Sequence, residues 1–413
     1  MIYRSVSEIF KSHFSWRKKL RYLAAEVKQL GRKRSRPPKR RKANNRRRNR
    51  GYAITEMGEL SDSVFKLMFR IDRPSFEYLA SRLKNSLDRN ELLATNSSGS
   101  PVTVTTRLAV TLRWLAGGSY LDICFGWGIG HSTFFSDRGV LWPTIEALNE
   151  LFVIGVPIHD DDALQELSDG FARQSNNILT GCIMAMDGIA IKTRAPYKWE
   201  VPRVTDYRNR KGGFGIVVLA GCDINCKFIF AVTNHCGSTN DVIAWRDSSL
   251  YHAIEEGLLP SNFFIIGDEA FPTTNQCLSP WPGRGLGLAK DAFNYWLSNS
   301  RQCIERAFGI LTKRWGILWR RFHFSFDRWA LVMQVCMKLH NYCVDNNDSP
   351  PPRRFNEDMR RGDRWAVYHN RHDDDDVLRS RANGDRRRNI TDELESRGIV
   401  RPPHAQVNSR ALA

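Results

Sequence analysis

The spacing of hydrophobic residues changes near residue 177, and this change divides the chain. Between residues 56 and 152 apolar residues recur at intervals of three and four, which predicts helices. Further on they form short runs rich in Ile, Val and Phe, which predict strands. The predicted strands span 178–193, 213–222, 226–234 and 262–270. Helices are expected at 241–257, 299–318 and 328–345, with a loop at 272–287.

The second half of the chain therefore has the element order of a ribonuclease-H-like α/β fold: three strands, a helix, a strand and further helices. Within the first half, residues 104–152 predict two short helices around a Gly-rich turn, the pattern of a helix-turn-helix. Ser132 and Thr133 would then begin the recognition helix. An ordinary helical subdomain packed on a catalytic core explains the same pattern.

Charge is concentrated at the two ends of the chain. Residues 1–50 hold 19 Lys and Arg against two acids, whereas residues 349–413 hold 14 Arg against 11 acids. With a net charge of +18 for the whole chain, the middle is close to neutral. The run at 31–50 has too little apolar content to fold alone, which favours a nuclear-import signal and phosphate-binding arm over a solubilising tail or a mitochondrial presequence.

These patterns predict four segments and no membrane partner, since no stretch approaches ~18 consecutive apolar residues. Nine scattered cysteines favour a reducing compartment. The segments are a basic arm (1–52), a helical, helix-turn-helix-like region (53–174), a ribonuclease-H-like domain (175–348) and a disordered Arg- and Asp-rich tail (349–413).

Three acids stand where burial makes a carboxylate costly. Asp187 interrupts a predicted strand on the face of Ile183, Ala185, Ile189 and Ile191; Asp268 ends another strand; and Glu305 borders the apolar stripe of a helix. Carboxylates from adjacent strands and a packed helix can converge on Mg²⁺ or Mn²⁺, and a metal pair would promote in-line phosphoryl displacement. Each acid alone has a structural explanation: backbone amides for Asp187, a cap for Asp268, and Arg301 or Arg306 for Glu305.

Five motifs in order resemble the transposases of the PIF/Harbinger superfamily, which are DDE superfamily endonucleases. The resemblance runs from Ser61 to Val344. Its motifs are "MAMDGIAI", "HCGSTNDVIAWRDSSL", "FIIGDEAFP", "NSRQCIERAFGILTKRWGIL" and "VCMKLHNYC".

The resemblance implies a metal-binding triad of Asp187, Asp268 and Glu305, with 36 residues between the last two. It implies two Mg²⁺ or Mn²⁺ ions, hydrolysis at transposon ends and strand transfer by the freed 3′-hydroxyl. The implied partners are double-stranded DNA, a second copy of the chain and a Myb-like accessory protein. Ala190 stands where the family usually has His, and Asp241 matches a further family acid that we interpret as an accessory group or a helix N-cap.

Two further groups allow more than one interpretation. Arg301, Arg306, Lys313 and Arg314 either bind DNA phosphates or form a solvated face; Cys222, Cys226, Cys236 and His235 are a weak zinc pattern. The leading hypothesis is a nuclear DNA transposase or derived nuclease. The alternative is a domesticated DNA-binding or regulatory protein that keeps the fold without cutting.

Overall fold

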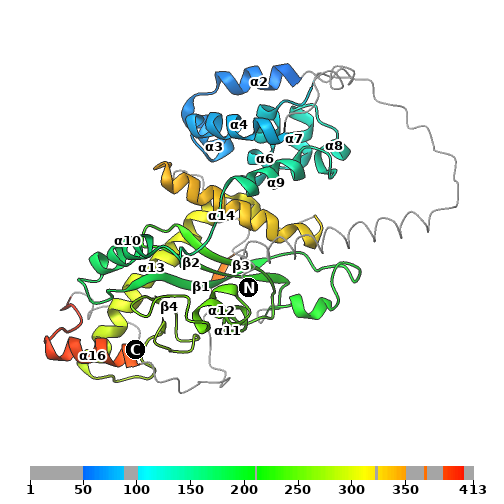
Figure 1. Cartoon of the computed structure of the whole chain (residues 1–413). Helices are drawn as coiled ribbons and strands as arrows, with labels where there is room; N and C mark the ends of the chain where they lie inside the picture. Colours follow the sequence, from blue (N-terminus) through cyan, green and yellow to red (C-terminus); the bar gives the residue numbers. More distant parts are fainter. Residues whose placement is uncertain are drawn as a thin grey trace, which may run out of the picture. The chain divides into compact units, whose positions relative to one another are not determined.

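A mixed β-sheet forms the centre of the second half of the chain (Figure 1). The computed structural model describes residues 50–87, 101–209, 212–320, 324–349, 367–369 and 385–403. The strand order is β3-β2-β1-β4-β5, and β6 also pairs with β1. Strands β1 to β3 are antiparallel, whereas β4 and β5 run parallel to β1. The strands are β1 (Cys182–Lys192), β2 (Gly215–Cys222), β3 (Phe228–Cys236), β4 (Phe264–Ile266), β5 (Cys277–Leu278) and β6 (Val367–His369).

This sheet agrees with the mixed α/β class expected of a ribonuclease-H-like domain, and its details refine the prediction. The hairpin between β2 and β3 turns at Asp223, whose carboxylate accepts a hydrogen bond from the Lys227 backbone N–H. Strand β5 lies inside the predicted loop and was missed, because two residues give no periodicity. The helix predicted at 241–257 is two helices, α11 (Asp241–Arg246) and α12 (Ser249–Glu255), because the Ser248 hydroxyl caps a new helix there.

Strand β1 has two differently covered faces. Ala185, Ile189 and Ile191 pack into the core that includes helix α13 (Leu288–Arg314). Ile183 packs instead into the second core, which includes residues of α11 and α12. The expected single face for Ile183 and Asp187 is therefore wrong, because the pairing with β4 is irregular between Cys182 and Met184 and shifts the alternation.

The first half of the described chain is helical, as predicted. Its helices are α2 (Arg50–Glu59), α3 (Asp62–Phe69), α4 (Arg73–Leu87), α6 (Val104–Leu115), α7 (Tyr120–Gly126), α8 (His131–Phe135), α9 (Leu141–Leu151) and α10 (Asp161–Gln174). Helices α7 and α8 enclose the Gly-rich turn, and Ser132 and Thr133 lie exposed on α8. Helix α8 has only five residues, so its backbone rises about 7 Å.

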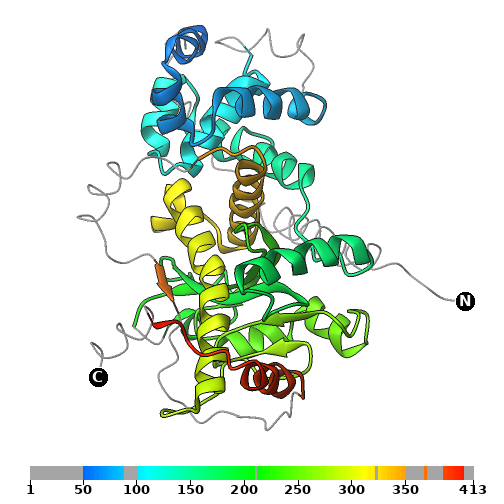
Figure 2. The same ribbon diagram turned by 90° about the vertical axis from the view of Figure 1, so that its left-hand side faces the viewer.

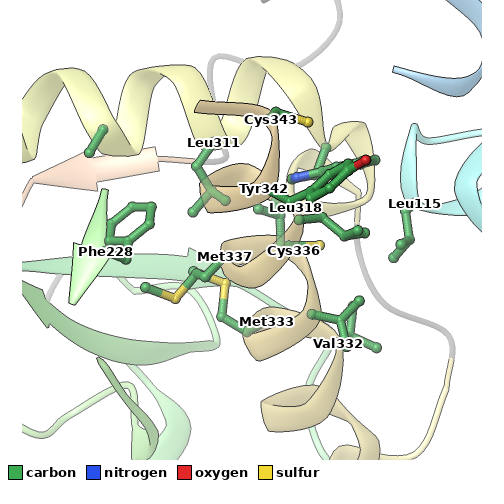
Figure 3. Close-up of a cluster of buried hydrophobic side chains, with 14 of the residues drawn as sticks. Leu115, Phe228, Leu311, Leu318, Val332, Met333, Cys336, Met337, Tyr342 and Cys343 are labelled. Carbon is green, nitrogen blue, oxygen red and sulfur yellow. The ribbon is translucent and has the colours of Figure 1, made fainter. Parts of the chain in front are cut away.

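The helical region and the sheet share one hydrophobic core, and Arg47–Ala413 form one compact unit. Helix α14 (Trp329–Asp345) contacts α9 on one side and β3 on the other. Figure 3 shows this core, with Leu115 of α6 and Phe228 of β3 on opposite sides of α14. At Gly117 the backbone has φ +94°, and a Cβ there would lie 3.0 Å from the Gly316 carbonyl carbon. The Gly117–Gly118 break thus lets the chain contact the 3-10 helix η2 (Gly316–Trp319) closely.

Part of the C-terminal segment is folded. Helix α16 (Asp385–Ser396) packs beside α13, as Figure 2 shows in red and yellow. Its Thr391 hydroxyl accepts a hydrogen bond from Trp281 Nε1 at 2.9 Å, and the Arg387 guanidinium lies 3.9 Å from the centre of the Trp281 ring. The prediction of disorder over 349–413 is therefore wrong for 385–403, because Leu394 and Arg387 give this helix a packing face that composition hides. The basic arm at 1–49 lies outside the described residues.

Membrane insertion finds no support in the described helices, none of which combines the length and the apolar character of a membrane span.

Candidate active site at the carboxyl end of β4

Two of the predicted acids lie on adjacent strands. Parallel pairing aligns Ala185 of β1 with Ile266 of β4. Asp187 lies two residues after Ala185, and Asp268 lies two residues after Ile266. The same register therefore places the two acids next to each other, just past the carboxyl end of β4. Asp187 is 4% exposed, whereas Asp268 is half-buried and accepts a hydrogen bond from the Ala270 N–H at 3.0 Å.

The Asp187 carboxyl has a strongly perturbed environment. Burial raises its pKa to about 7; the Arg301 guanidinium opposes this shift, and the negative charge of Asp268 adds to it. The Gly188 N–H donates to Asp187 Oδ1 at 2.8 Å, which also favours the charged form. Because burial disfavours its charged form, a cation close to this carboxyl would favour ionisation.

Helix α13 contributes the third acid. Arg301 donates to Asp187 Oδ2 at 2.8 Å and to Glu305 Oε1 at 3.0 Å, so one guanidinium joins the strand acid to the helix acid. Because Arg301 and Glu305 are one turn apart on the helix, they form an i, i+4 pair. The Glu305 side chain is 42% exposed and therefore lies at the rim of the site. We call Asp187, Asp268, Glu305 and Arg301 the acid site.

Asp241 lies against the other face of β1. It is fully buried at the start of α11, and a Cβ built on Gly188 would lie 2.1 Å from its Oδ1. Only glycine leaves room for this carboxyl, which explains the Asp-Gly pair in the motif. The N-cap interpretation of Asp241 is wrong, because the Asn240 side chain caps the helix by accepting from the Ile243 N–H at 2.9 Å. The negative charge of Asp241 also raises the pKa of Asp187.

Comparison with known proteins agrees with this geometry. Residues 186–341, which include all three acids, match the family model of the DDE superfamily endonuclease. Over these residues the chain is therefore similar to DDE superfamily endonucleases. The chain is also 25% identical over 310 residues to "Protein ALP1-like" of Arabidopsis thaliana, a match that covers 70% of this chain and 73% of that protein. Both findings support the resemblance to PIF/Harbinger transposases. No solved structure matches the chain significantly.

DDE superfamily endonucleases generally use divalent metals. The question is whether the side chains of the acid site suit such an ion. Within the described ranges, no three His, Cys, Asp or Glu side chains gather closely enough to hold an ion. The chemistry nevertheless fits a hard cation: Asp187 and Glu305 both pair with Arg301, the charge of Asp268 acts on Asp187, and all three acids offer oxygen ligands. Arg301 holds Asp187 and Glu305 by the positive charge that a metal would otherwise provide.

The four basic residues of α13 considered as DNA contacts lie in different environments. Arg301 belongs to the acid site, and Arg306 and Lys313 are exposed on the helix. Arg314 is 1% exposed and donates to the Arg70 carbonyl at 2.7 Å and to the Asp348 carbonyl at 2.5 Å. A DNA-binding role for Arg314 is therefore wrong, because its side chain is enclosed in the core.

Two contacts around β1 were not predicted from the sequence. The contact of Arg301 with Asp187 joins residues 114 positions apart, and no local pattern signals it. The packing of Asp241 on Gly188 does have a signal, the glycine directly after a strand acid. His340 of α14 is fully buried, and its Nε2 lies 2.8 Å from the Cys226 carbonyl oxygen. Of the weak zinc pattern, Cys222 and Cys226 are buried, and the Cys222 thiol contacts Cys303 at 3.5 Å.

Proposed function

We propose that the chain is a metal-dependent DNA endonuclease that hydrolyses phosphodiester bonds at transposon ends and joins the freed 3′-hydroxyl strand to target DNA. Asp187, Asp268 and Glu305 are the proposed metal ligands. The observation that carries this proposal is the β1–β4 register, which aligns the two strand acids, together with the Arg301 contact that connects Asp187 to Glu305.

Each side chain has a distinct part in this proposal. Asp187 is held rigidly in the sheet, since its strand is buried on both faces and its carboxyl accepts from the Gly188 N–H. Asp268 is oriented by the Ala270 N–H. Glu305, at the exposed rim, can adjust its rotamer, and Arg301 balances the charge of the acids. Bound Mg²⁺ or Mn²⁺, two ions in a DDE mechanism, would activate the attacking water or hydroxyl and stabilise the leaving oxygen.

DNA affinity is proposed to come largely from outside the endonuclease domain. Phosphate contacts dominate the affinity of DNA-binding proteins, and the middle of the chain is close to neutral. The basic run at 31–50, which would also direct the protein to the nucleus, supplies the missing positive charge. A Myb-like companion and a second copy of the chain are further proposed sources of DNA contacts, and α7 and α8 are a proposed helix-turn-helix.

The alternative is a nuclear DNA-binding or regulatory protein that retains the endonuclease fold without cutting. One observation favours it: Arg301 forms ion pairs with both Asp187 and Glu305, so these two acids are held together without a metal ion. The two hypotheses differ in whether Asp268 matters for a chemical step.

The deciding experiment incubates the full chain with labelled duplex DNA that carries the terminal inverted repeats flanking its gene, with and without Mg²⁺. We expect Mg²⁺-dependent cleavage that Asp268→Asn abolishes and Glu269→Gln preserves, since Glu269 is an exposed neighbour outside the proposed ligand set. Binding without cleavage, unchanged by Asp268→Asn, would instead support the regulatory protein.

A further inference from the structure

An aromatic pair stands in water beyond the end of β1. The rings of Tyr197 and Trp199 are stacked, with centroids 4.4 Å apart and planes 5° from parallel. Tyr197 is 51% exposed and Trp199 is 80% exposed. Large aromatic side chains usually bury most of their surface, so two of them stacked and exposed call for an explanation.

The loop beneath this aromatic pair is rigid by construction. Arg194 forms two hydrogen bonds with the Glu200 carboxylate, at 2.7 and 2.5 Å. Glu200 Oε2 also accepts from the Tyr197 N–H at 2.8 Å, and the Glu200 N–H donates back to the Tyr197 carbonyl at 2.9 Å. The Arg194 guanidinium lies 4.5 Å from the centre of the Tyr197 ring. Side chain and backbone thus hold the two rings in place before any ligand arrives, which lowers the entropy cost of binding.

The same arginine anchors the loop to the body of the protein. Arg194 donates to the Phe324 carbonyl at 3.1 Å and lies 5.1 Å from the centre of the Phe326 ring. The aromatic pair therefore cannot fold back onto the protein without breaking a salt bridge, a hydrogen bond and a cation–π contact.

The position of the pair relates it to the acid site. Strand β1 continues five residues past Asp187 to Lys192, which is roughly 16 Å of extended chain. The loop that carries Tyr197 and Trp199 follows the carboxyl end of β1. Because β1 and β4 are parallel, Asp268 also follows the carboxyl end of its strand. The two rings therefore lie beyond the end of the strand that carries Asp187.

We propose that Tyr197 and Trp199 form a stacking platform for an unpaired nucleobase of a bound DNA strand. This inference rests on the proposed function for its ligand, DNA. Aromatic side chains combined with positive charge are the recurring means of holding single strands, because every base has a face that can stack. Lys198, which lies between Tyr197 and Trp199 in the sequence, and Arg203 are both exposed. Two positively charged side chains therefore belong to the same loop region as the aromatic pair. Those charges favour a nucleic acid over an apolar protein partner.

The test measures binding of fluorescein-labelled oligo(dT) and of a blunt duplex of equal length to the full chain, without divalent metal. All variants carry Asp268→Asn, so that cleavage does not interfere. We expect Trp199→Ala to weaken oligo(dT) binding about 5- to 150-fold, as loss of one stacked base does elsewhere, with little change for the duplex. Trp199→Phe should retain most of the affinity because it keeps a ring.

The matched control is Leu288→Ala, which removes another exposed apolar side chain, 73% exposed at the start of α13 and outside both the acid site and the proposed helix-turn-helix, and should leave both affinities unchanged. Equal weakening for oligo(dT) and duplex, or no weakening for either, would overturn the platform; the second result would indicate that the rings serve a protein partner. The outcome is separable from cleavage. Wild-type chain that cuts with Mg²⁺ while Trp199→Ala binds normally refutes only the platform, and selective weakening in a chain that never cuts refutes only the nuclease.

Discussion

Helix α13 supplies an arginine to each of two carboxylate sites, and the two sites are built on opposite principles. In the acid site, Arg301 faces Asp187 and Glu305, with Asp268 close by, so acids outnumber the cation. In the second site, which we call the Arg314 site, Arg314 and Lys66 both pair with Asp348. There the Asp72 N–H also binds Asp348, and the Arg70 carbonyl accepts from Arg314.

The charge balance of the two sites distinguishes a buried ion pair that stabilises the fold from buried acids that can serve a function. The Arg314 site is closed, and its cations match or exceed its acids, which is how a folded protein satisfies a buried ion pair. The acid site leaves Glu305 at its rim and carries an excess of acids. Burial, and to a lesser extent the charge of Asp268, raises the pKa of Asp187 to about 7. A site that is under-compensated and partly open is suited to a ligand that brings positive charge.

The largest expected effect separates the two sites by activity. Asp187→Asn should fold and bind DNA, yet lose cleavage by at least about 10³-fold, because several kcal/mol of metal-dependent stabilisation disappear. Cleavage rate and thermal melting, measured side by side, check this. If Asp187→Asn unfolded while Asp268→Asn and Glu305→Gln stayed folded, Asp187 would instead be a structural acid.

Arg314→Met should have the opposite profile. It removes one of the two cations of the buried Asp348 carboxylate, together with the donor to the Arg70 and Asp348 carbonyls, and breaking a buried ion pair typically costs about 3–5 kcal/mol of unfolding free energy. Urea denaturation checks this, with the exposed Lys313→Met as control, expected within about 0.5 kcal/mol of wild type. A mild effect of Arg314→Met, equal to that of the control, would contradict the structural role of this site.

The pH dependence of stability should have opposite signs at two groups. Burial lowers the pKa of His340 to about 4, below its unfolded value of 6.5, so its contribution is lost as pH falls through this window. For Asp187 the folded pKa of about 7 exceeds the unfolded 3.8, so stability is lost as pH rises through that window.

Each contribution is on the order of 3 kcal/mol, and the two oppose each other between pH 4 and 6.5. Asp187→Asn should therefore make the loss of stability in acid steeper, and His340→Gln should make it shallower. Denaturation curves at pH 4.5, 5.5, 6.5 and 7.5 measure both slopes; parallel slopes for all three proteins would show that neither group titrates as described.

The smallest expected effect concerns Arg301 itself. At pH 8, Arg301→Gln removes a charged hydrogen bond to Asp187 and should cost about 1–3 kcal/mol, less than Arg314→Met. At pH 5 the cost should nearly vanish, because Asp187 is then protonated and no longer needs a cation. Thermal melts at the two pH values test this, with exposed Arg306→Gln as the reference; a cost independent of pH would mean that Arg301 acts by packing.

Sequence alone determined much of the architecture, because local patterns carry it. The runs around Asp187 and Phe264 predicted their strands, and periodicity predicted the helices before residue 152 and after residue 299. The three acids could be singled out because a carboxylate on an apolar face is costly wherever the chain places it. The motif order added the family, since five weak signals in sequence are specific together.

Tertiary structure decided what depends on contacts between distant residues. The irregular pairing that moves Ile183 to the other face arises from the register with β4, and α16 folds because Trp281 and α13 offer it a surface. Arg301 and Arg314 are indistinguishable as letters on one helix; only the partners brought by β1 and by the segment after α14 make one a bridge between acids and the other a core ion pair. Composition and periodicity indicate which secondary structure and which degree of burial each residue favours. The charge balance of a site depends instead on which distant segments of the chain pack together there.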